Sequence, residues 1–135
     1  MINDCKELVG TLFLHKGRDI KTGLDCFGLV LEVYRRNGII LADPMPDYDE
    51  NWETRQNGNP ILENYHLKWR RLKTCEKPDL LDIVLFGNKP SFPTHIGIVV
   101  DDDTVLHCGK GYGVVLNRLS RLGKVIHGYY CLKDK

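Results

Sequence analysis

One cysteine of the sequence stands where a reactive thiol is expected. Cys26 follows Asp25, which suits a helix N-cap, so its sulfur would lie in the first turn of a helix. The unpaired backbone N–H groups and the positive end of the helix dipole stabilise a thiolate at that position. We therefore expect a lowered pKa at Cys26 and a nucleophilic sulfur. The alternative is an inert cysteine that packs beneath the helix.

Two histidines supply candidate partners, because a cysteine nucleophile needs a base within reach and a polar group that orients the base. His95 opens one β-rich run and His107 nearly closes the next. If the aspartates at 101–103 form the hairpin connection, His107 lies opposite Gly97, and both imidazoles face one side of the sheet. A two-residue loop would reverse this parity and separate them. Gly97 is expected to leave room for the ring of His107.

Two further interpretations concern the glycines beside Cys26 and a possible metal site. Gly23 and Gly28, on either side of Cys26, are expected to keep bulk away from the sulfur so that a substrate backbone can approach it. The side chains that could bind zinc are Cys26, His95, His107 and Cys108. They contain no closely spaced ligand pair, and adjacent strand residues face opposite sides of a sheet. We therefore predict no metal.

One helix and a series of strands must position these residues. Residues 25–38 predict a helix that ends at Gly38, and its apolar stripe consists of Leu29, Val30, Val33 and Tyr34. Upstream, residues 3–9 predict a short amphipathic helix. Residues 42–78 predict a connecting region with a short helix inside it.

Short β-rich runs separated by turn residues follow Pro78. They are residues 81–86, 95–100, 104–108, 114–117 and 125–132. Helices followed by a meander of strands predict the α+β class.

Length and composition are those of an ordinary globular domain. The 135 residues are 42% hydrophobic and 27% charged, with a formal net charge of +1. These values predict one domain over residues 1–135 and argue against nucleic acid as a partner. No stretch has the pattern of a secretory signal or a membrane span, so we expect a cytoplasmic chain without membrane contact. The five scattered cysteines are expected to be free thiols.

Several segments resemble, in order, the motifs of the NlpC family of papain-like cell-wall cysteine peptidases. The cysteine segment Leu-Asp-Cys-Phe-Gly-Leu-Val resembles that family's D-C-S-G-L-V helix start. Four further segments are similar to its G-T-P-Y, G-D-L-V-F-F, H-V-G-I-Y and F-I-H motifs, at residues 10–13, 81–86, 95–100 and 105–107. The resemblance runs from about residue 10 to residue 116.

The resemblance implies a papain-like fold, with N-terminal helices and the nucleophile helix packed on an antiparallel sheet. It implies that Cys26 is the nucleophile, His95 the general base and acid, and His107 the residue that orients His95. The backbone N–H of Cys26 would form part of the oxyanion hole. The expected reaction is hydrolysis of peptidoglycan stem peptides between D-γ-glutamate and the following diamino acid, with no metal or organic cofactor.

The resemblance also suggests where substrate binds and in what setting. The expected substrate contacts are Asp25, Phe27, Phe13 and Arg18. Phe27 stands where the family has serine, and Phe13 stands where tyrosine is common. The bulky residue after the cysteine and the approach G-R-D-x-x-x-G-L-D-C look like the phage tail subgroup, which implies other tail proteins as partners and a location in the virion tail. The alternatives are a non-catalytic tail assembly module that retains the fold, and a thiol amidase or acyltransferase that uses the same three residues.

Overall fold

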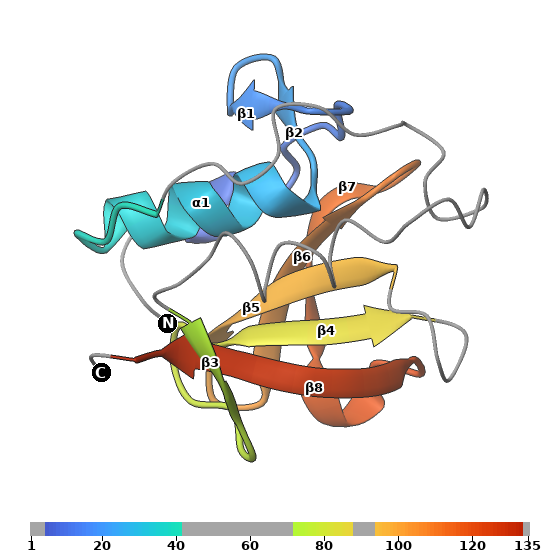
Figure 1. The fold of residues 1–135 in the computed structure, drawn as a ribbon. Helices are drawn as coiled ribbons and strands as arrows, with labels where there is room; N and C mark the ends of the chain where they lie inside the picture. The colour runs from blue at the N-terminus through green and yellow to red at the C-terminus, as the bar shows by residue number, and fades with distance from the viewer. Residues whose placement is uncertain (1–4, 42–71, 88–93, 134–135) are drawn as a thin grey trace, which may run out of the picture.

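One helix lies across one face of a six-stranded antiparallel sheet (Figure 1). The computed structural model describes residues 5–41, 72–87 and 94–133. The sheet order is β3-β8-β4-β5-β6-β7. Its strands are β3 (Leu72–Cys75), β4 (Ile83–Gly87), β5 (His95–Asp101), β6 (Thr104–Gly109), β7 (Gly113–Arg118) and β8 (Val125–Leu132). The helix is α1 (Cys26–Arg36), and β1 (Arg18–Asp19) and β2 (Gly23–Leu24) form a small ribbon at its N-terminal end.

The sequence predicted α1 correctly at both ends. The Asp25 carboxylate accepts a hydrogen bond from the backbone N–H of Gly28 at 2.8 Å, which caps the first turn. Asn37 is the C-cap, and Gly38 follows with a φ of 79°, a left-handed conformation that glycine adopts without strain. The whole predicted apolar stripe is buried, so the period of the pattern identified the face that packs on the sheet.

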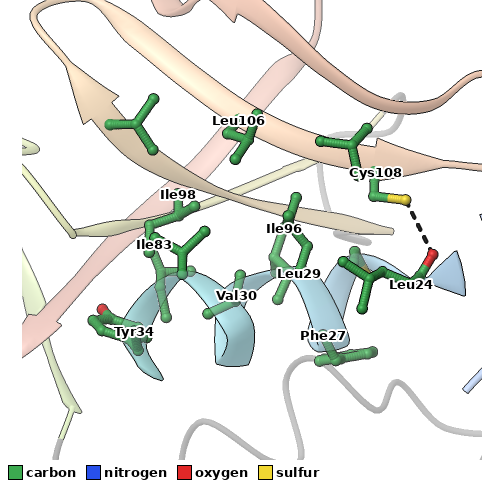
Figure 2. Packing of buried hydrophobic residues seen from close by; sticks show 14 of the residues in the cluster. Leu24, Phe27, Leu29, Val30, Tyr34, Ile83, Ile96, Ile98, Leu106 and Cys108 are labelled. Atoms are coloured by element: carbon green, nitrogen blue, oxygen red, sulfur yellow. Dashed lines mark hydrogen bonds between the residues drawn. The ribbon is translucent and has the colours of Figure 1, made fainter. Parts of the chain in front are cut away.

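The sheet buries apolar side chains on both faces. Figure 2 shows the main core, in which Leu29 and Val30 of α1 pack against Ile96 and Ile98 of β5 and Leu106 of β6. The opposite face carries a smaller cluster made of Val84, Phe86, Val99 and Val105. Because side chains alternate along a strand, His95 and His107 belong to the face with the smaller cluster, opposite to α1.

The β5–β6 hairpin turns differently from the prediction, yet it keeps the predicted register at the histidines. Asp101 pairs with Thr104, so the connection is shorter than the predicted loop 101–103. The register then shifts between Val99 and Asp101, and beyond this irregularity Gly97 lies opposite His107 as predicted. The residue inserted by the bulge restores the parity that the shorter loop would have reversed.

Two expectations about the elements were wrong. The described residues before α1 hold a single 3-10 turn, Lys6–Leu8, and no α-helix, because a segment this short cannot repay the cost of helix nucleation. Strand β3 was missed, since it lies inside the stretch 42–78 that was predicted as a connection. Residues 42–71, including the short helix expected among them, lie outside the described part. Within the described residues no helix has the length and apolarity to cross a membrane.

Candidate active site

Cys26 is the first residue of α1, and its sulfur meets the start of β5. The backbone of Ile96, the residue after His95, hydrogen-bonds to the thiol. The N-terminal end of α1 therefore lies over the part of the sheet where β5 begins (Figure 1). The side chain is only 7% exposed.

The pKa of Cys26 is shifted in the opposite direction to the one expected from the sequence. Burial raises the pKa of the thiol well above its ordinary value, and the neighbouring Asp25 carboxylate raises it further. The Ile96 backbone hydrogen bond and the Arg18 guanidinium oppose the shift. A helix N-terminus favours the thiolate, but here removal from water outweighs it. In the free protein Cys26 is thus a neutral thiol.

The two histidines form a bonded pair on adjacent strands. Nε2 of His95 lies 3.2 Å from Nδ1 of His107, and the rings cross at 87°. Phe86 of β4 packs edge-on against both rings and holds them in place. A β-carbon at Gly97 would lie 2.7 Å from Cγ2 of Val105 and 3.2 Å from the β-carbon of His107, so both neighbours on β6 require glycine there.

Both imidazoles are held in the neutral form. Burial, followed by the nearby His107 and Lys124, lowers the pKa of His95 to about 3. Burial also lowers the pKa of His107, while the hydrogen bond with Asn117 raises it. His95 is consequently a free base at neutral pH, as an acceptor for a thiol proton must be.

Asn117 and Tyr112 complete the polar cluster, and sequence reasoning missed both. Asn117 of β7 places its Oδ1 2.6 Å from Nε2 of His107. The Tyr112 hydroxyl, from the β6–β7 turn, lies 3.5 Å from Nε2 of His95. Asn117 was detectable in principle, because it is the polar residue two positions beyond Val115, which pairs with His107. The only sequence signal that could have pointed to Tyr112 is its position in a turn between two glycines.

Asp25 and Arg18, two of the expected substrate contacts, bind each other. Oδ1 of Asp25 lies 2.8 Å from Nη1 of Arg18 and also caps Gly28, and Oδ2 accepts from the backbone N–H of Lys16 at 3.2 Å. Asp25 is buried, so its carboxylate holds the preceding loop onto the helix.

The other two expected contacts differ in accessibility. Phe27 is 1% exposed and lies in the main core (Figure 2). Phe13 is partly buried against that core and bridges to Leu24 of β2. The space beside Gly28 is filled by the backbone carbonyl of Gly17, so a packing contact within the chain, rather than approach of a substrate, requires glycine there.

Cys108 faces away from the histidines. Its Sγ donates to the backbone carbonyl of Leu24 at 3.1 Å in the main core, on the α1 side of the sheet (Figure 2). All cysteines among the described residues are free thiols. The same residues include no cluster of three or more His, Cys, Asp or Glu side chains placed to hold a metal ion.

Comparisons with known proteins identify the family and relatives of this chain. The profile of the NlpC/P60 family matches residues 10–127. The chain is 25% identical over 120 residues to the probable peptidoglycan endopeptidase LytE of Bacillus subtilis (strain 168), over 89% of this chain and 29% of LytE. It thus spans less than a third of that relative.

Solved structures share the fold at low identity. The NlpC/p60 domain of the peptidoglycan hydrolase SagA matches with a TM-score of 0.54 and 15% identity, over 90% of this chain and 88% of that one. An NlpC/P60 family protein from Bacillus cereus ATCC 10987 matches with a TM-score of 0.61 and 17% identity, over 92% and 36%. NlpC2 from Trichomonas vaginalis matches with a TM-score of 0.60 and 19% identity, over 92% and 42%. With the family profile covering most of the sequence, from the segment before the cysteine helix through the histidine strands and into β8, the chain belongs to the NlpC/P60 family.

Proposed function

We propose that the chain is a cysteine peptidase that hydrolyses peptide bonds in peptidoglycan stem peptides. The observation that carries this proposal is the hydrogen-bonded pair of His95 and His107 at the start of β5, where the Cys26 thiol meets the backbone of Ile96. Nε2 of His95 is engaged with His107, so Nδ1 is the nitrogen left to receive the thiol proton.

Proton transfer accompanies attack in this mechanism, because thiol and imidazole are both neutral beforehand. His95 takes the proton of Cys26 as the sulfur bonds to the substrate carbonyl carbon, and backbone N–H groups at the start of α1 stabilise the oxyanion. Protonated His95 then gives its proton to the leaving amine, the C–N bond breaks, and a thioester remains. Water attacks the thioester with His95 as the base, which releases the acid and the thiol.

The family and the names of two relatives support the substrate class. LytE is called a probable peptidoglycan endopeptidase and SagA a peptidoglycan hydrolase. We propose that the bond cleaved is the one between D-γ-glutamate and the diamino acid, because the cysteine and histidine motifs resemble those of the NlpC family.

Purified muropeptides of defined diamino acid test the proposal. Wild-type protein is expected to release two peptide products with a mass gain of one water, detected by mass spectrometry. Cys26→Ala and His95→Ala should each abolish cleavage. His107→Ala should retain some activity, because His107 acts through His95. Cys75→Ala is the matched cysteine control and should cleave normally. A folded wild type that is inert on stem peptides of every common chemistry would contradict the proposal.

We propose that the protein is part of a phage tail. The basis is the bulky residue after Cys26 and the G-R-D-x-x-x-G-L-D-C segment that leads to it, which resemble the phage tail subgroup. Peptide mass spectrometry of purified virions tests this directly. Recovery of the chain with tail proteins supports it, and recovery only from the host cell envelope contradicts it.

A further inference from the structure

Asn117 ends a row of hydrogen bonds that runs from β7 through His107 on β6 to His95 on β5. Its amide oxygen lies 2.6 Å from Nε2 of His107, and Nδ1 of the same ring lies 3.2 Å from Nε2 of His95. Strand pairing produces this row, since Val115 pairs with His107 and Asn117 lies two residues further along the same face of β7.

The direction of each hydrogen bond follows from the chemistry of the amide. An amide oxygen only accepts, so the proton of neutral His107 must reside on Nε2. Nδ1 of His107 then carries a lone pair and accepts from Nε2–H of His95. With its proton on Nε2, neutral His95 has an unprotonated Nδ1.

We infer that Asn117 is a positioning residue that sets the tautomers of His107 and His95, and thereby leaves Nδ1 of His95 as the base for Cys26. If the amide were turned so that its NH₂ group faced His107, every bond in the row would reverse, and His95 would present Nδ1–H to a thiol that must lose a proton. The Tyr112 hydroxyl is compatible with either direction, because it both donates and accepts.

The inference deepens the proposed function and rests on it only for the role of His95 as base. Asn117 is exposed, so its substitution removes no core packing. Its effect must therefore pass through the ring of His107, which separates a positioning role from a structural one.

Nitrogen NMR of the histidine rings in the free, full chain is the primary test. In the wild type, His95 and His107 are expected as Nε2–H tautomers at pH 7.5. In Asn117→Leu and Asn117→Ser, which remove the acceptor or withdraw it from reach, both rings should become mixtures of tautomers. Asn117→Asp keeps an acceptor and should keep the wild-type tautomers. Arg118→Gln, an exposed change on the same strand, is the matched control.

Cleavage kinetics provide the second readout. Loss of the hydrogen bond is expected to lower kcat roughly tenfold in Asn117→Leu with little change in KM, and Asn117→Asp should restore most of it. Wild-type His95 with Nδ1–H, or wild-type tautomers in both Asn117→Leu and Asn117→Ser, would overturn the inference. The expected tautomers in a wild type that cleaves nothing would contradict the proposed function, and with it the role of His95 as base, but not the control of the tautomers by Asn117.

Discussion

The Tyr112 hydroxyl lies over Gly109, in the space that a β-carbon at residue 109 would fill. Its turn contains Gly111 and Gly113, both with positive φ, so this path of the chain depends on glycine. Burial raises the pKa of Tyr112, and the nearby Cys108 and Cys26 raise it further. The Tyr112 hydroxyl therefore lies beside His95 and within electrostatic range of Cys26, and we expect the ring to shield Cys26 from solvent.

Replacing the ring should therefore open the site. Tyr112→Ala is expected to increase the rate at which iodoacetamide labels Cys26, while Tyr112→Phe, which keeps the ring, should label like the wild type. Tyr112 is half exposed, so either change should alter the free energy of unfolding by no more than about 1 kcal/mol. Peptide mapping after timed alkylation at pH 7 measures the rates. An unchanged rate in Tyr112→Ala would show that other side chains bury the sulfur.

In the wild-type protein, Cys26 should not be the first cysteine to react. Cys75 is half-buried, whereas Cys26 is buried and its pKa is raised, so at neutral pH its thiolate is both scarce and covered. We expect Cys75 to be labelled ahead of Cys26, and the Cys26 rate to keep rising as pH increases beyond 9. Faster labelling of Cys26 at pH 6 to 7 would show that the helix N-terminus outweighs burial.

The histidine pair should make the fold sensitive to mild acid. Folded His95 and His107 have lowered pKa values, so between pH 5 and 6.5 the unfolded chain binds more protons than the folded chain. The free energy of unfolding should therefore fall as pH decreases through this window, by at most about 1.4 kcal/mol per pH unit for each histidine. Urea unfolding at pH 5, 6 and 7.5 measures it, and His95→Gln should reduce the slope. An equal free energy of unfolding at pH 5, 6 and 7.5 would contradict the lowered pKa values of the two histidines.

Loss of either member of the Asp25–Arg18 ion pair should loosen the start of α1. Asp25→Ala removes the cap on Gly28 and is expected to cost roughly 1–3 kcal/mol of unfolding free energy. Arg18→Gln leaves a buried carboxylate without its cation and should cost a similar amount. The double variant should cost less than the sum, because each single change already breaks the same bond. Chemical denaturation of the four proteins tests this, and strict additivity would contradict it.

The KM of Arg18→Gln tests the separate prediction that Arg18 contacts substrate. A KM that rises while kcat is unchanged would support a substrate contact in addition to the ion pair. An unchanged KM would leave Arg18 with its structural role alone.

Local patterns in the sequence determined most of the elements. The cap at Asp25, the apolar stripe of α1 and the glycine at its end depend on residues a few positions apart, and each predicted strand from β4 to β8 was found near its predicted bounds. Alternation along β5 and β6, combined with the predicted pairing of Gly97 with His107, placed His95 and His107 on one face. These features follow from backbone periodicity and propensity, which neighbouring residues largely decide.

Tertiary structure decided the rest. The hairpin register at His107 survived a wrong loop length only because β5 carries a bulge before Asp101, and no local signal distinguishes that bulge from a longer turn. Asn117 joins the histidines through the pairing of β6 with β7, and the raised pKa of Cys26 results mainly from its burial in the packed domain. Contacts between residues far apart in the chain, and the burial they produce, exist only once the whole domain has packed. The sequence alone therefore indicated candidate residues for the chemistry but not the protonation state in which the fold holds them.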